Sequence, residues 1–200
     1  EYYEGARNSR ADSWEYVSRC MEVLHKLHES ELTADHEFNM RERIAFYEGL
    51  CAAHGGTLFE DYTEVRIHMN ELLDQLDALQ RPKVLSHIDS VADNFLFLPD
   101  GSVRLIDWEY SGMCDPLIDI SMCAIYSYYD EDAVEKLMQI YFGREPELLE
   151  RKVIYSYIAL GGFLWALWAV YKASLGEEFG EYTLIMYRYA KKYYKKVCLL

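Results

Sequence analysis

A histidine, two aspartates and an asparagine interrupt the apolar residues of the segment SHIDSVADNFLF, residues 86–97. Their spacing is His87-x-Asp89-x4-Asn94, and a further aspartate, Asp107, follows the next apolar segment. Carboxylate and amide oxygens are the hard donors that Mg²⁺ prefers, and phosphoryl transfer depends mainly on positioning the phosphates and neutralising their charge. Asn94 and Asp107 therefore predict a magnesium site close to a phosphate group.

Asp89 and His87 begin the same loop, and the chemistry gives them different roles. An acceptor hydroxyl loses its proton late in a loose phosphoryl-transfer transition state, so Asp89 would orient the hydroxyl and accept its proton. His87 is the other candidate catalytic residue, although a histidine here suits bracing of the loop better than general-base catalysis. Each residue alone is weak evidence, because an aspartate after a strand is usually a turn or cap residue.

The elements that must position these residues are short strands within a helical chain. Apolar segments at 84–86, 94–98 and 103–107 predict strands, and Pro99-Asp100-Gly101-Ser102 predicts the turn that joins the last two. Helical periodicity, N-cap residues and glycine or proline stops predict a mainly α-helical fold with a small embedded β-hairpin. The expected helices span residues 13–29, 37–53, 61–79, 116–129, 131–142, 146–173 and 181–197.

Composition restricts the partners and the compartment. The net charge of −14 argues against nucleic acid or an anionic membrane surface as a partner. Residues 1–30 lack the apolar stretch of a signal peptide, and the five cysteines are odd in number with no CxxC pair. We therefore expect reduced thiols in a cytoplasmic protein. The chain opens on Glu1 and not on methionine, which suggests a piece of a longer protein.

One segment is long and apolar enough to be tested as a membrane span. Residues 153–171, VIYSYIALGGFLWALWAVY, carry no charge, and a span needs about 20 such residues. The segment stands alone, and it contains a Gly-Gly pair and several tyrosines. A helix that is apolar on all sides can equally be the central helix of a helical lobe, so we expect no membrane span.

The order of the motifs resembles the kinase fold: a catalytic loop HxDx4N, a strand, a Pro-Asp-Gly turn, a strand and then Ile106-Asp107-Trp108. LIDWEYSGMCDPLIDIS at 105–121 is similar to the superfamily of choline/ethanolamine kinases and aminoglycoside phosphotransferases. EYYEGAR at 1–7, Trp165-x-x-Trp168 and EFGEY at 178–182 resemble bacterial LicA-like choline kinases. The resemblance implies the C-terminal lobe of a protein-kinase-like (α+β) fold over 9–200, with 1–8 as the end of the inter-lobe hinge. Catalytic and metal loops are expected at 84–110, and substrate-pocket helices at 116–197.

The resemblance implies ATP- and Mg²⁺-dependent phosphorylation of the hydroxyl of choline or a related small amino alcohol. A quaternary ammonium has no N–H donor, so its recognition requires aromatic faces and a nearby carboxylate. Trp165 and Trp168 lie three apart on one helix face and can form two walls of such a box, although aromatic residues at this spacing are also ordinary core residues. The resemblance adds Glu109, Tyr110, Glu178, Phe179, Tyr182 and Tyr129 as further substrate-binding residues, and Asp119 as a structural brace of the catalytic loop.

Several parts of a complete kinase have no counterpart in these residues. No GxGxxG sequence and no strand with an embedded lysine precede the helices, so the N-terminal lobe is missing and we expect little or no activity from this chain alone. Two alternatives stay open: an aminoglycoside phosphotransferase-like enzyme, and a non-catalytic cation-binding pseudokinase module. The basic tail at 191–196, KKYYKK, is expected to be a solvated helix face, and the oligomeric state is left open.

Overall fold

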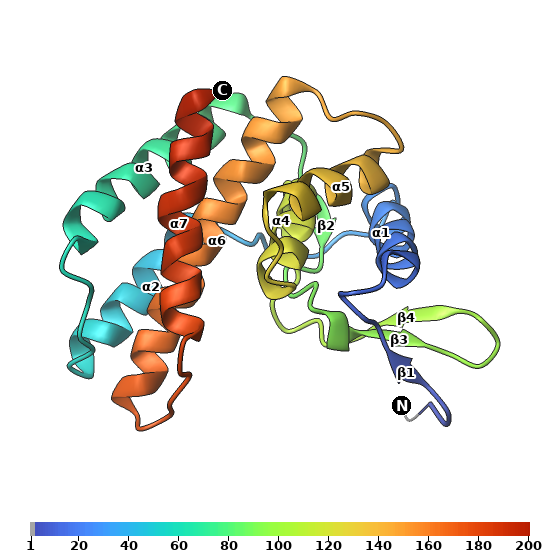
Figure 1. Ribbon diagram of the computed structural model, residues 1–200, viewed down its shortest axis with the longest axis horizontal. Helices are drawn as coiled ribbons and strands as arrows, with labels where there is room; N and C mark the ends of the chain where they lie inside the picture. The colour runs from blue at the N-terminus through green and yellow to red at the C-terminus, as the bar shows by residue number, and fades with distance from the viewer. Residues whose placement is uncertain (1–2) are drawn as a thin grey trace. The chain divides into compact units, whose positions relative to one another are not determined.

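The computed structural model describes residues 3–200, which form two compact units (Figure 1). The first unit contains the chain up to Phe38 together with Pro82–Arg151, and it carries all the strands of the described chain. The second unit contains Asn39–Arg81 and Lys152–Leu200 and is helical. The predicted catalytic and metal residues all lie in the first unit, whereas the two tryptophans of the predicted box lie in the second.

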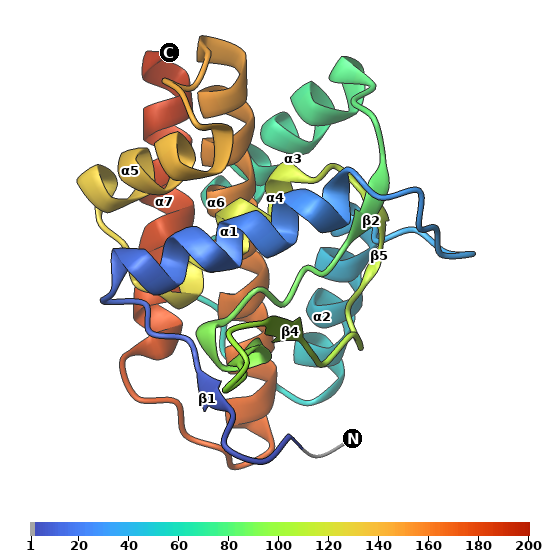
Figure 2. The same ribbon diagram turned by 90° about the vertical axis from the view of Figure 1, so that its right-hand side faces the viewer.

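Three helices form the body of the first unit: α1 (Trp14–His28), α4 (Leu117–Tyr126) and α5 (Glu131–Phe142). The α1 helix buries Val17, Cys20, Met21 and Leu24 at helical spacing and packs against α5 (Figure 2). The N-cap residue of α5 is Asp130, whose side chain accepts a hydrogen bond from the backbone N–H of Ala133.

Two small antiparallel sheets hold the loops of the first unit. In the first sheet the strand order is β1-β3-β4, with β1 at Arg7–Asn8, β3 at Phe95–Phe97 and β4 at Val103–Leu105 (Figure 1). A short 3₁₀ turn, Ala92–Asn94, leads directly into β3. The second sheet pairs β2 (Val84–Ser86) with β5 (Gly112–Cys114), as Figure 2 shows.

The second unit is built from α2 (Met40–Ala53), α3 (Tyr62–Leu79), most of α6 (Leu148–Ser174) and α7 (Tyr182–Leu199). Gly162 allows α6 and α7 to approach closely, because a Cβ atom there would lie 2.6 Å from the carbonyl oxygen of Met186. The α6 helix is the one helix of residues 3–200 with the length and hydropathy of a membrane span. Of its most apolar window 89% is buried inside the structure, which favours a core helix.

The predicted fold class is confirmed: the chain is mainly helical with small sheets. The seven predicted helices begin and end within a few residues of the observed ones. The strand prediction was incomplete, because β1 and β5 were not expected and β4 ends at Leu105, so that Asp107 lies beyond the strand. Residues 1 and 2 of the predicted hinge segment lie outside the described residues, and Arg7–Asn8 of that segment form a strand paired with β3.

Candidate active site

The predicted catalytic loop runs from β2 to the turn before β3 and contains an unusual backbone conformation. Ile88, which is fully buried, has φ +70°, and Asp107 in the neighbouring loop has φ +62°. A left-handed conformation is uncommon outside glycine and is an outlier for a β-branched residue. Such strain persists only where the surroundings enforce it, and it concentrates at functional sites. The strained residue Ile88 directly precedes Asp89, and Asp107 is itself in a strained conformation.

Asp89 and Asn94 are joined by hydrogen bonds across the loop. The Nδ2 group of Asn94 donates to the backbone carbonyl of Asp89 at 2.8 Å and to its carboxylate Oδ2 at 2.9 Å. Both donor hydrogens of the amide are thereby engaged, which leaves Oδ1 of Asn94 as the atom that can bind a cation. Asn94 is 7% exposed, whereas Asp89 is half-buried.

The hairpin brings Asn94 and Asp107 to the same end of the sheet. The N–H of Ile106 donates to the carbonyl of Asn94 at 3.0 Å and so continues the pairing of Phe95 with Leu105. Asp107 follows immediately and is exposed. One amide oxygen and one carboxylate suit Mg²⁺, which commonly takes one or two carboxylates and completes its octahedron with phosphate oxygens and water. Within residues 3–200, no group of three His, Cys, Asp or Glu side chains is placed to hold a metal by itself.

His87 connects the catalytic loop to the loop that carries Asp107. Its side chain is fully buried, Nε2 donates to the carbonyl oxygen of Ile106 at 2.8 Å, and its ring meets the Trp108 ring edge-on at a centroid distance of 4.8 Å. Its Nδ1 has no hydrogen-bond partner in the described chain. These contacts join the two loops, and the bracing role favoured for His87 from the sequence stays a prediction.

Asp119, on α4, holds the backbone of the catalytic loop. Its Oδ2 accepts from the N–H of His87 at 2.9 Å, and its Oδ1 accepts from the N–H of Ile88 at 2.6 Å. The hydroxyl of Ser90 donates to the backbone carbonyl of Asp119 at 2.6 Å. Since Asp119 is fully buried, these bonds are made without competition from water. These hydrogen bonds are the contacts that a brace would make, and the bracing role that the resemblance implies for Asp119 stays a prediction.

Sequence reasoning missed two residues around this carboxylate, Ser90 and His28. Nε2 of His28, on α1, lies 2.9 Å from Oδ2 of Asp119, and both side chains are almost fully buried. His28 occurs on the apolar side of an amphipathic helix, where a buried polar residue requires a partner. That position was the available signal, but it does not reveal a partner 91 residues away in the sequence.

The second unit contains a cluster of aromatic side chains, which we call the aromatic cluster: Trp165, Trp168, Phe179 and Tyr182. Trp168 lies at its centre, with ring centroids 6.3 Å from Trp165, 4.8 Å from Phe179 and 6.2 Å from Tyr182. The Trp165 and Tyr182 rings meet it edge-on, at 83° and 74°. Trp165 is only 4% exposed, so it supports the cluster from within, while Trp168 and Phe179 keep partly exposed faces.

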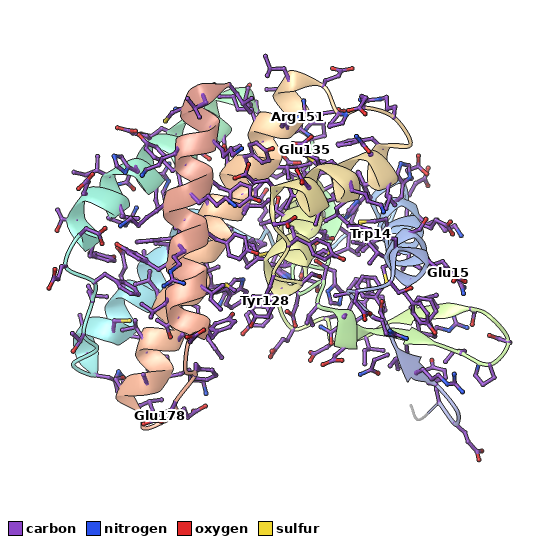
Figure 3. All side chains as sticks on the ribbon, in the orientation of Figure 1. Trp14, Glu15, Tyr128, Glu135, Arg151 and Glu178 are labelled. Carbon is purple, nitrogen blue, oxygen red and sulfur yellow. The ribbon has the colours of Figure 1, made fainter. Side chains whose placement is uncertain are left out.

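The other predicted substrate residues lie in different surroundings. Glu178 is exposed in the loop between α6 and α7 (Figure 3), three residues before Glu181, the N-cap residue of α7. Glu109, which is exposed, and Tyr110, which is half-buried, belong to the first unit and follow Asp107. Tyr129 also belongs to the first unit, is 8% exposed and donates its hydroxyl to the carbonyl of Ala11 at 2.6 Å. Burial raises the pKa of Tyr129, and its contacts are those of a packing residue.

A groove of about 830 Å³ runs beside α7 in the second unit, and none of the predicted site residues lines it. Its lining includes five basic side chains, of which Lys191 pairs with Asp61. The basic residues are Arg188, Lys191, Lys192, Lys195 and Lys196. Their positive charges repel a quaternary ammonium, so this groove does not suit choline.

Comparison of the fold with solved structures defines the class of protein. The structure resembles choline kinase LicA from Streptococcus pneumoniae with a TM-score of 0.81 and 30% sequence identity, over 98% of this chain and 69% of that one. It also resembles a choline/ethanolamine kinase family protein from Mesorhizobium loti with a TM-score of 0.80 and 26% identity, over 100% of this chain and 68% of the other. Both matches fall on the C-terminal portion of those kinases. The fold is thus that of the C-terminal part of a kinase-like phosphotransferase.

Sequence comparison gives the family. The chain belongs to the phosphotransferase enzyme family, whose profile matches residues 1–151. It is 27% identical to Protein LicA of Haemophilus influenzae over 176 residues, which cover 84% of this chain and 65% of that protein. The chain therefore spans just under two thirds of the length of this relative. A structure of LicA in complex with AMP is similar at 29% identity with a TM-score of 0.82.

Proposed function

We propose that this chain carries the catalytic and substrate-binding part of a kinase that transfers the γ-phosphate of ATP to the hydroxyl of choline or a related small amino alcohol. The observation that carries the proposal is the braced loop that presents Asp89 beside Asn94, at the end of the hairpin that also presents Asp107. The related proteins supply the substrate class, since LicA from Streptococcus pneumoniae is a choline kinase. The free cysteines of the described chain further support our proposal of a cytoplasmic location.

In the proposed reaction Asp89 orients the acceptor hydroxyl and takes up its proton as the bond to phosphorus forms. The hydrogen bond from Asn94 Nδ2 to Asp89 Oδ2 fixes the carboxylate and leaves its other oxygen for the hydroxyl. Asn94 Oδ1 and the Asp107 carboxylate would hold Mg²⁺. When bound, this ion supplies charge neutralisation at the phosphates. His87 and Asp119 keep the loop in its strained conformation.

The aromatic cluster is the proposed site for the methylated amine. Ring faces attract a cation through their negative quadrupole, and a desolvated quaternary ammonium gains about 2 kcal/mol or more from such contacts. Trp168 and Phe179 offer the partly exposed faces, and Tyr182 lies beside both. We propose that Glu178, which directly precedes Phe179 in the loop between α6 and α7, adds a carboxylate. The assignments of Glu109 and Tyr110 to substrate binding stay predictions, and we no longer assign Tyr129 to ligand contact because its hydroxyl is already bonded.

The deciding experiment measures ATP-dependent phosphorylation by the product of the complete reading frame, with choline, ethanolamine and kanamycin as acceptors. We expect turnover with choline, and a lower kcat/KM with ethanolamine, because its primary ammonium requires hydrogen-bond acceptors that aromatic rings do not provide. Turnover with kanamycin alone would identify an aminoglycoside phosphotransferase. Choline binding without any Mg²⁺-nucleotide binding would instead identify a cation-binding module and contradict the proposal.

A further inference from the structure

We propose that Tyr141, on α5, is a positioning residue for the catalytic loop, and that it acts through His28 and Asp119. Tyr141 lies outside the predicted site, near the C-terminal end of α5. Its hydroxyl lies 2.8 Å from Nδ1 of His28. His28 in turn contacts the carboxylate that holds the loop backbone.

The polar atoms form one continuous path through the interior of the first unit. From the hydroxyl of Tyr141 the path continues from Nδ1 to Nε2 of His28 and then over 2.9 Å to Oδ2 of Asp119. The side chains of His28 and Asp119 are 4% and 0% exposed, so water cannot replace a lost partner. Tyr141 is half-buried, which places the outer end of the path near the surface of α5.

The chemistry of imidazole assigns the protons along this path. A carboxylate only accepts hydrogen bonds, so the Nε2 atom that faces Asp119 carries a hydrogen. In a neutral ring Nδ1 is then the acceptor, and the hydroxyl of Tyr141 donates to it. The partner of one ring nitrogen thus fixes the tautomer that the other nitrogen presents, as in other buried histidines. Without that hydroxyl, Nδ1 becomes a buried acceptor with no partner, and the Nε2–H tautomer loses its preference.

The hydrogen bonds of Asp119, at the end of the path, connect the His28 tautomer to the conformation of the loop. Asp119 accepts the N–H groups of His87 and Ile88, and these two bonds hold Ile88 at φ +70°. A left-handed conformation is unfavourable for a β-branched residue, so the loop relaxes if the carboxylate turns away. The residue that follows Ile88 is Asp89. A change at Tyr141 therefore reaches the proposed catalytic carboxylate through the backbone.

The test compares Tyr141→Phe with Tyr128→Phe by amide hydrogen exchange at His87 and Ile88. Tyr128 is a matched control in the same unit, because it is 54% exposed and lies outside the path from Tyr141 to Asp119 (Figure 3). We expect Tyr141→Phe to accelerate exchange at His87 and Ile88 about tenfold, the effect of weakening one net hydrogen bond, and Tyr128→Phe to leave it unchanged. Unchanged exchange in Tyr141→Phe would overturn the proposal.

Two further measurements separate positioning from general support of the fold. His28→Gln retains an amide N–H that can reach Asp119 without Tyr141, so adding Tyr141→Phe in that background should have no further effect on exchange. Full additivity of the two changes would contradict the path. The ¹⁵N NMR signals of the His28 ring in the unmodified chain must show the neutral Nε2–H tautomer, and an Nδ1–H tautomer would overturn the proposal even if Tyr141→Phe fails to fold.

The kinetic consequence rests on the proposed function. In the complete enzyme we expect Tyr141→Phe to lower kcat severalfold with an unchanged KM for choline. The reason is that the aromatic cluster, the proposed choline site, lies in the other unit and keeps its own contacts. An unmodified enzyme that does not phosphorylate choline would refute the proposed function, while the exchange and NMR results would still decide the path from Tyr141 to the loop. A raised KM with unchanged kcat would refute the positioning role.

Discussion

At the residue scale, the proposed catalysis depends on a few side chains. The Nδ2 group of Asn94 donates hydrogen bonds to the backbone carbonyl and the carboxylate of Asp89, and these bonds fix the carboxylate that we propose accepts the proton. We expect Asp89→Asn to lower kcat of the complete enzyme at least 100-fold, the lower end of the usual contribution of a general base, with choline affinity retained. Asp93→Asn is the control, because Asp93 is exposed and only accepts from Asn8. Comparable losses in the two variants would exclude Asp89 as the base.

Asp107 gives a second prediction at this scale, because its φ of +62° suits glycine better than aspartate. We expect Asp107→Gly to leave the free energy of unfolding unchanged or to raise it by about 1 kcal/mol, while Mg²⁺-dependent nucleotide binding is lost. Thermal unfolding and calorimetry with Mg²⁺-ATP measure the two effects separately. If Asp107→Gly were destabilising and still bound Mg²⁺-ATP, Asp107 would be a structural residue and not a ligand.

Whether a site residue could be predicted from the sequence depends on how far away its partners lie in the chain. The spacing of His87, Asp89 and Asn94 is local, so the loop could be recognised without coordinates. The role of Asp119 came from the family resemblance, because its partners lie 31 and 32 residues earlier. His28 and Tyr141 gave no comparable signal: their hydrogen bonds join three helices, and no local pattern encodes such a contact.

At the element scale, local periodicity predicted the helices but not the short strands. Amphipathic spacing and caps are properties of consecutive residues, and α1 and α5 begin within a residue of where such signals place them. The β1 and β5 strands contain two and three residues and exist only because a distant strand pairs with them. Gly112 in β5 marks such a contact, since a Cβ atom there would lie 2.8 Å from the backbone nitrogen of Phe38.

At two helical glycines we predict that alanine changes the free energy of unfolding in opposite directions. Gly49 in α2 has no heavy atom within 4 Å of an added Cβ, whereas at Gly162 in α6 that atom would lie 2.6 Å from the carbonyl oxygen of Met186. We expect Gly49→Ala to raise the free energy of unfolding by about 0.5–1 kcal/mol through helix propensity. Gly162→Ala should lower it by about 1–3 kcal/mol, because the α6 and α7 backbones must separate. Urea unfolding measures both, and a stabilising Gly162→Ala would show that the two helices pack less tightly than described.

At the scale of the whole molecule, proposed chemistry and proposed substrate recognition fall on two compact units. The sequence did not predict this division, because both units are assembled from segments that are discontinuous in the chain. The aromatic cluster comes from α6, α7 and the loop between them, all within the second unit, and its rings contact one another. We therefore expect the proposed cation binding to be separable from the proposed phosphoryl transfer.

This separation predicts that the 200-residue chain retains choline binding but loses most of the phosphorylation activity of the complete reading frame's product. The 200 residues contain no GxGxxG sequence to cover the phosphates, and they match 69% of the length of the Streptococcus pneumoniae choline kinase. We expect the chain alone to bind choline, with quenching of tryptophan fluorescence that Trp168→Ala abolishes, but to phosphorylate it at least 100-fold more slowly than the complete product. Trp14→Phe is the matched control, because Trp14 packs against Tyr129 in the first unit and lies outside the aromatic cluster (Figure 3). Equal turnover by the two proteins would contradict this prediction, since positioning of the phosphates would then require nothing beyond these residues.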